Sequence, residues 1–226
     1  MSGRLDHAAE GLLNLIYPKR AECMGCGTKA GFERDWLCED CRQALANRWI
    51  GASEPPPGGL FDGSAYGFRY GGPAAGLVRN LNYRGVRQLA PLMGRHMVKA
   101  FEGLQPAHVD WVVPVPMHPR RLRERGCNHA ALLAEAAAKG LELQMVEALA
   151  RTRNTRQQAR LDVGARLTNQ EGAFALTRDV SGRRILLVDD VRTTGATANA
   201  CARTLWAGGA TAIYLLCFAE AREDGE

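Results

Sequence analysis

The chain lacks any long run of apolar residues, which argues against a bilayer-spanning helix. A short apolar patch at residues 12–16 follows the acidic Asp6 and Glu10, and no small-residue cleavage site comes after it. This is not the pattern of a signal peptide. We therefore expect a cytoplasmic protein, in a compartment that keeps thiols reduced.

The chain also has few aromatic residues and only a small net charge. Aromatic side chains make up 7% of the 226 residues, and the formal net charge is +5, carried mostly by arginine. A mild basic excess is compatible with a phosphate-rich ligand but does not by itself indicate nucleic-acid binding. The length predicts one α/β domain with a sizeable core and a small appendage.

Cysteine, in contrast, is patterned. Two Cys-x-x-Cys pairs lie close together near the N-terminus, formed by Cys23, Cys26, Cys38 and Cys41. In a reducing compartment such pairs predict a tetrahedral structural zinc site with no open coordination position. A redox pair and an iron–sulfur cluster are the alternatives. The three scattered cysteines are expected to pack as small apolar residues.

The domain organisation is predicted from a proline- and glycine-rich segment and from the order of strand and helix patterns. Residues 52–59 (ASEPPPGG) predict a linker between an N-terminal segment with the cysteine module (1–51) and a larger domain (60–226). Strand patterns at 63–70, 109–115, 143–149, 185–188 and 212–218 alternate with helical patterns at 72–81, 88–101, 126–138 and 198–207. This alternation predicts a parallel sheet that binds ligands beyond the carboxyl ends of its strands.

The most informative segment is residues 185–197, ILLVDDVRTTGAT. Four apolar residues predict a strand buried on both faces, and Asp189 and Asp190 follow directly. Next comes a hydroxyl-rich turn into a helix: Thr193, Thr194, Gly195, Ala196, Thr197. Backbone N–H groups and hydroxyls there favour a phosphate, whereas the acids favour a neighbouring group with hydroxyls. The pattern therefore predicts a sugar phosphate; the alternative is an ordinary strand–turn–helix with two exposed acids.

Two arginine-rich segments are further candidates. Residues 111–130 contain a predicted strand, three prolines and then Arg120 and Arg121, which could hold a pyrophosphate group. Residues 149–174 form a long basic connection that includes Arg151 and Arg153, and long connections inside compact domains are usually functional or disordered. For both segments the alternative is a solvated basic surface.

Residues 185–197 resemble the phosphoribosyl pyrophosphate (PRPP) motif of type I phosphoribosyltransferases. The resemblance implies a Rossmann-like fold in which Asp189 and Asp190 contact the ribose hydroxyls and residues 193–197 wrap the 5′-phosphate. It also implies Mg²⁺ bound with PRPP, and a mobile loop closing over PRPP at the basic connection with Arg151 and Arg153.

The whole order of features resembles the ComF family and its GntX-type relatives. The resemblance rests on the cysteine module, NYRGVRQLA (82–90), VPVPMHPRRLRERGCNHAALLA (113–134), the RTRNTRQQARL block (151–161) and the PRPP motif. Arg192 is an unusual charge beside the acid pair. The resemblance implies a role in natural transformation, with PRPP or a related phosphorylated ribose, single-stranded DNA and the DNA-uptake machinery as partners.

Two classes of function therefore stay open. One is a DNA-uptake factor, for which Tyr66, Phe68, Tyr70 and Tyr83 are candidate stacking platforms. The other is an active Mg²⁺-dependent phosphoribosyltransferase that passes through an oxocarbenium-like ribose. No base-recognition pocket is evident in the sequence, so the acceptor of such a reaction is not predicted.

Overall fold

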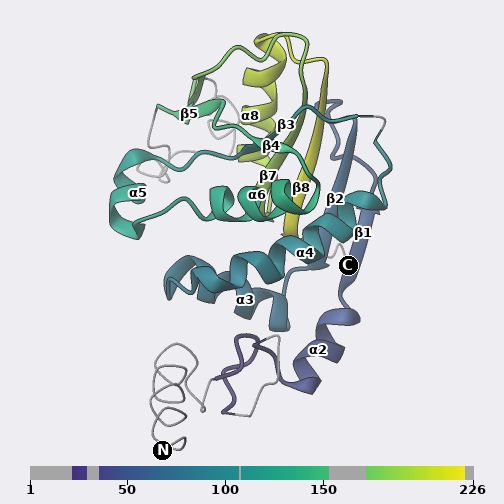
Figure 1. Ribbon diagram of the computed structural model, residues 1–226, viewed down its shortest axis with the longest axis vertical. Coiled ribbons are helices and arrows are strands. Elements are labelled where there is room, and N and C mark those ends of the chain that lie inside the picture. Colours follow the sequence, from purple (N-terminus) through teal and green to yellow (C-terminus); the bar gives the residue numbers. More distant parts are fainter. Residues whose placement is uncertain (1–21, 30–35, 107, 153–171, 222–226) are drawn as a thin grey trace, which may run out of the picture.

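A mostly parallel six-stranded sheet forms the centre of the molecule (Figure 1). The computed structural model describes residues 22–29, 36–106, 108–152 and 172–221. The strand order is β1-β2-β8-β7-β3-β4, and only β1 runs antiparallel to its neighbour. The strands are β1 (Trp49–Ser53), β2 (Gly63–Arg69), β3 (Trp111–Pro114), β4 (Gln144–Met145), β7 (Arg184–Arg192) and β8 (Ala212–Glu220).

Helices cover both faces of the sheet, so its central strands are apolar on both sides. In β7, Leu186 and Val188 pack into the core beneath α3 (Gly72–Tyr83), α4 (Ala90–Glu102) and α6 (His129–Gly140). Ile185 and Leu187 pack into the core beneath α8 (Ala196–Ala207). Successive strand residues point to opposite faces, which explains the unbroken apolar run before the acid pair.

The strand order reverses between β3 and β7, which lie side by side and parallel. The chain leaves β3 toward α6 on one face and leaves β7 toward α8 on the other face. Such a switch point opens a crevice at the carboxyl ends of the two strands, where ligands bind in open α/β sheets. The motif at residues 185–197 ends at this crevice.

The cysteine segment and α2 (Glu39–Ala46) pack below α3 (Figure 1). The approach is close, because a Cβ atom on Gly76 would lie 2.0 Å from the carbonyl oxygen of Gly25. Asn80 strengthens the contact: its Nδ2 donates to the carbonyl oxygens of Met24 (2.9 Å) and Gly76 (3.0 Å). The segment predicted as a linker, residues 52–59, begins inside β1, since Ala52 and Ser53 pair with β2; only the part after residue 53 lies between two strands.

The expected fold class is confirmed: a mixed α/β architecture with a mostly parallel sheet, preceded by a cysteine cluster. The sequence patterns did not predict the short helix α5 (Pro119–Arg125), which has no buried residue, or strand β1. They also missed a small second sheet, β5 (Leu149–Arg151) with β6 (Phe174–Leu176). No helix among the described residues is long and apolar enough to cross a membrane.

Candidate functional site

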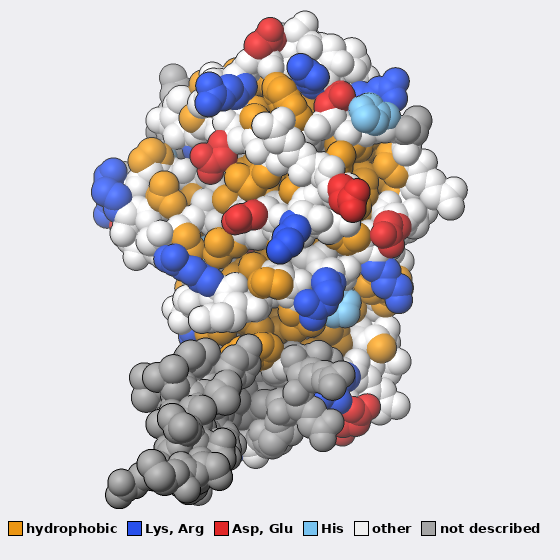
Figure 2. Space-filling view, viewed as in Figure 1, with side chains coloured by type: hydrophobic (Ala, Val, Ile, Leu, Met, Phe, Trp, Pro, Cys, Tyr) orange, Lys and Arg blue, Asp and Glu red, His pale blue; other side chains and the backbone are white. Residues whose placement is uncertain are grey.

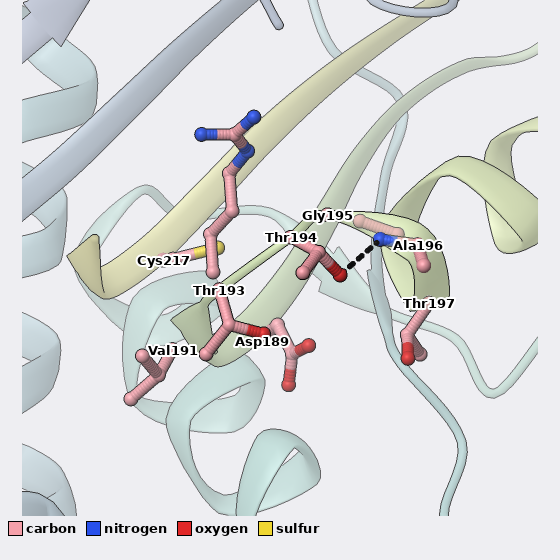
Figure 3. A pocket seen from close by; sticks show the side chains of 10 residues that line it. Asp189, Val191, Thr193, Thr194, Gly195, Ala196, Thr197 and Cys217 are labelled. Carbon is pink, nitrogen blue, oxygen red and sulfur yellow. Dashed lines mark hydrogen bonds between the residues drawn. The ribbon is translucent and has the colours of Figure 1, made fainter. Parts of the chain in front are cut away.

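The loop between β7 and α8 encloses a small cavity of about 50 Å³ (Figure 3). Its lining includes the predicted phosphate-binding residues together with the first acid: Asp189, Thr193, Thr194, Gly195, Ala196 and Thr197. Gly195 is the N-cap of α8 and has φ +75°, a left-handed conformation that glycine adopts without strain. The structure therefore brings Asp189 and the hydroxyl-rich loop together.

This loop presents hydrogen-bond donors to the cavity. The first N–H groups of α8 have no acceptor within the helix; among the described residues, that of Ala196 donates to the Thr194 hydroxyl at 3.4 Å (Figure 3). Thr193 and Thr194 are exposed. Free N–H groups, the helix dipole and hydroxyl groups together suit a phosphate group.

The two acids lie near the C-terminal end of β7 but have different partners. Asp189 Oδ1 accepts from the backbone N–H of Asp190 at 2.9 Å, and Asp190 Oδ1 accepts from that of Val191 at 2.6 Å. Asp190 Oδ2 accepts a short hydrogen bond from Nδ2 of Asn82. Asp190 is therefore fixed by α3, whereas Asp189 faces the cavity of the hydroxyl-rich loop.

The pKa of Asp189 is also shifted. Burial, and next the like charge of Asp190, raise the pKa of Asp189 well above its usual range. The free protein thus favours a proton on Asp189, which lowers the repulsion between the two carboxyl groups. A ligand that brings hydroxyl donors or a cation to this point stabilises the ionised pair.

Asn82 is a site residue that the sequence analysis quoted only as part of the family resemblance. It stands at the end of α3, 108 positions before the acid it contacts. Nothing in its local pattern separates it from an ordinary helix-terminal asparagine, so only the tertiary structure identifies it.

Arg192 lines the same cavity and is held by a buried partner. Its Nη1 donates to Glu220 Oε1 at 2.6 Å, and the Glu220 side chain is 2% exposed. The guanidinium also lies close to the loop, since a Cβ atom on Gly195 would be 3.2 Å from Arg192 Nε. The charge that looked unusual in sequence is therefore a paired cation beside the loop.

A second group of residues lies at the start of α6. His129 is 3% exposed, and its pKa is lowered by burial and then by Arg125, whereas Asp190 acts in the opposite direction. Asn128 caps α6 by accepting from the N–H of Ala130 at 3.2 Å, and its Nδ2 donates to the carbonyl oxygen of Val115 at 3.0 Å. This cap ties the β3 exit to the start of α6.

The four predicted arginines are distributed differently. Arg120 is exposed on α5, with Nε donating to Glu124 at 3.1 Å, and Arg121 lies beside it on the same helix. Arg151, at the end of β5, lies over the Phe174 ring at 5.3 Å and acts electrostatically on Asp189. Arg153 lies outside the described residues. Of the four, Arg151 is linked to the acid pair, through its electrostatic effect on Asp189.

Two of the four candidate stacking aromatics are excluded by burial. Tyr66 is 0% exposed and Phe68 is 2% exposed, so neither ring can accept a base. The prediction was wrong for these two because an alternating strand that is covered on both faces exposes neither set of side chains. Tyr70 and Tyr83 are exposed.

The four predicted ligand cysteines form one cluster. Their sulfur atoms all lie within 4.8 Å of one another, and Cys26 and Cys38 are 3.8 Å apart. A tetrahedral zinc site with Zn–S bonds of about 2.3 Å has sulfur–sulfur edges of about 3.8 Å, so this arrangement fits zinc. Backbone N–H groups of Gly25 and Cys38 donate to Cys23 Sγ at 3.4 and 3.3 Å, as suits a metal-bound thiolate.

The family model described as the phosphoribosyl transferase domain matches residues 128–226, which include the acid pair and the loop. DNA utilization protein YhgH of Escherichia coli (strain K12) is 34% identical over 155 residues, covering 66% of this chain and 67% of YhgH.

Other relatives carry competence names. Competence protein F of Haemophilus influenzae is 34% identical over 98 residues, 42% of this chain and 43% of that protein. Competence protein ComFC of Bacillus subtilis is 28% identical over 135 residues, 60% of this chain and 54% of that protein. Among solved structures, a glutamine PRPP amidotransferase from B. subtilis aligns with a TM-score of 0.40 and 19% identity, over 57% of this chain and 26% of that one.

Proposed function

The chain belongs to the ComF family of proteins with a phosphoribosyltransferase domain, and we propose that it acts in the uptake or utilization of DNA. We further propose that it binds PRPP at the β7–α8 loop. The names of its relatives, DNA utilization protein and competence protein, support the DNA role. The observation that carries the PRPP role is the single cavity shared by Asp189 and residues 193–197.

In this proposal the loop and the start of α8 bind the 5′-phosphate, and the acids bind the ribose hydroxyls. Thr193 and Thr194 donate hydroxyl hydrogens to the phosphate, and the free N–H groups of α8 add further donors. Asp189 and Asp190 accept from the two hydroxyl groups of the ring. Mg²⁺, bound with PRPP, would neutralise the pyrophosphate charge.

The cysteine cluster is proposed to hold a structural zinc ion. Four thiolates complete the coordination shell, so the metal stabilises the fold and takes no part in chemistry. A four-cysteine zinc site needs reduced cysteines and therefore suits a reducing compartment, which supports a cytoplasmic location.

Calorimetry with PRPP and Mg²⁺ tests the ligand. Asp190→Asn keeps the shape of the side chain but removes its charge, and loss of a charged hydrogen bond costs about 1.5–3 kcal/mol, or about 10- to 150-fold in affinity. Wild-type protein that fails to bind millimolar PRPP would end the PRPP part of the proposal.

A deletion strain tests the DNA role. It should replicate its chromosome normally but use or take up donor DNA poorly. Normal use of donor DNA by the deletion strain would contradict the role.

A second candidate function is an active Mg²⁺-dependent phosphoribosyltransferase, favoured by the intact acid pair, of which Asp189 lines the cavity and Asp190 is its immediate neighbour. The acids would orient the ribose and offset the positive charge that develops on it as pyrophosphate leaves. Release of pyrophosphate from PRPP, dependent on a nitrogenous acceptor and lost in Asp190→Asn, would establish this function. Binding of PRPP without turnover would favour the first candidate.

A further inference from the structure

Tyr83, the last residue of α3, is 72% exposed and is the most exposed of the large hydrophobic side chains described. The neighbouring apolar residues of α3, such as Leu77 and Leu81, are fully buried. The Arg125 guanidinium lies 4.8 Å from the centroid of the Tyr83 ring. The Tyr83 ring is therefore exposed to solvent and contributes little to the packing of the core.

Cations gather around this ring from two segments of the chain. Arg84 follows Tyr83 directly, Arg87 comes three residues later at the start of η1 (Arg87–Leu89), and Arg125 is the last residue of α5. Figure 2 shows Lys and Arg side chains over α5 and over the neighbouring end of α3. Arg84 is weakly paired with Glu22, at 3.7 Å and with both side chains exposed, and within the described part of the chain neither Arg87 nor Arg125 has a carboxylate at ion-pair distance.

The two segments are joined by a hydrogen bond from a side chain to the backbone. Arg87 Nη2 donates to the carbonyl oxygen of Gly126 at 3.4 Å, and a Cβ atom on Gly126 would lie 3.3 Å from that nitrogen. Gly126 has φ +74°, a conformation that side chains disfavour. A glycine at this point lets the Arg87 side chain lie close to the end of α5.

This cluster lies at the edge of the acid pair. Asn82, the residue before Tyr83, donates to Asp190. His129 responds electrostatically to Arg125, Arg87 and Asp190 together. The exposed tyrosine and its arginines are thus contiguous with the proposed ribose phosphate site.

We propose that Tyr83 is a stacking platform for one base of single-stranded nucleic acid, with Arg84, Arg87 and Arg125 on the adjoining phosphates. The proposal rests on the proposed DNA-handling function and assigns that partner to a surface. An aromatic face within a cationic groove is the recurring way to bind single strands without reading sequence. A simple anion such as pyrophosphate would gain nothing from stacking on an aromatic ring. The bases of a duplex are already stacked on one another and are not available to the ring.

Fluorescence anisotropy with a labelled oligo-dT tests the platform in the full-length protein. Tyr83→Ala should weaken binding about 5- to 150-fold, the loss of one stacked base, whereas Tyr83→Phe should bind like wild type. Arg125→Ala should lower the log–log salt dependence by about 0.7, the contribution of one phosphate on a single strand. Tyr70→Ala is the matched control, because Tyr70 is 37% exposed but lies at the end of β2.

The outcomes separate this proposal from the function on which it rests. If wild type and Tyr83→Ala bind the oligonucleotide equally, or if Tyr70→Ala weakens binding as much, the platform is wrong and the DNA role stands. If wild-type protein binds no oligonucleotide at low salt, the platform and direct DNA binding both fail. PRPP binding that persists in Tyr83→Ala shows that the variant is folded.

Discussion

At the scale of single residues, the acid pair is asymmetric in ways that its sequence does not reveal. Asp189 and Asp190 are neighbours with the same side chain, but one borders the phosphate cavity and the other is held by Asn82. Burial and like charge raise the pKa of Asp189, so its ionisation opposes folding.

This asymmetry predicts a pH-dependent gain in stability for Asp189→Asn. Because the folded-state pKa of Asp189 is raised, the unfolded chain gives up this proton more readily, and wild type loses stability as pH rises through the window above the unfolded pKa. The variant avoids that loss. Thermal unfolding without ligand should show the variant more stable than wild type at pH 8, with the difference shrinking toward pH 4. A constant difference across this range would contradict the assignment.

Asn82 is predicted to act by positioning Asp190. Asn82→Ala removes a hydrogen bond to a charged acceptor, so PRPP affinity should fall by up to about tenfold. If the role is positioning, the effect should vanish in the Asp190→Asn background, which a double-mutant cycle measures. Asn47→Ala, at the end of α2, is the control. Equal losses in both backgrounds would indicate a structural role instead.

At the scale of elements, the cysteine segment and α3 act as one packed unit. Gly76 allows the backbone of Gly25 to lie directly on the helix, and Asn80 donates to the carbonyl oxygen of the preceding residue, Met24. This contact links the proposed zinc module to the helix that ends in Asn82 and Tyr83.

Gly76→Ala is therefore predicted to weaken the docking of the cysteine segment. The new Cβ atom would meet backbone atoms of Gly25 at 2.0 and 2.7 Å. Because these are backbone atoms, no change of side-chain rotamer can relieve the clash. Overpacking of this kind costs about 1–3 kcal/mol, visible as a lower midpoint in denaturant unfolding. Gly103→Ala, whose Cβ would meet nothing closer than 3.4 Å, is the control. Equal stability of the two variants would contradict the close approach.

At the scale of the whole molecule, a small cysteine-rich segment is joined to a large sheet domain with its own two-sided core. A segment of this size has little core of its own, because its buried residues, such as Leu37 and Leu45, belong to the core beneath α3 and α4. Its stability is expected to come from metal and from docking together.

Metal analysis should find one zinc ion per chain. Structural zinc sites contribute about 10–16 kcal/mol of apparent binding free energy, so chelation should unfold the cysteine segment at temperatures where the sheet domain stays folded. Hydrogen exchange resolves the two regions. Purified protein without metal, but with protected amides at residues 36–46, would rule out the zinc site.

The sequence by itself determined the elements whose signals are local. The apolar run before Asp189 predicts β7, since a strand covered on both faces must be apolar throughout, and glycine with threonines after it predicts the turn into α8. Spacing alone also identified the four cysteines, because ligands from two tight turns must come in pairs.

Only the tertiary structure decided which distant residues meet. Asn82 reaches Asp190 because α3 covers the sheet on the same face as Val188, and Arg192 meets Glu220 because β7 and β8 pair in register. Tertiary packing also decides that Tyr66 and Phe68 are buried whereas Tyr83 is exposed. Exposure depends on what packs against an element, and packing joins segments that are far apart in the chain.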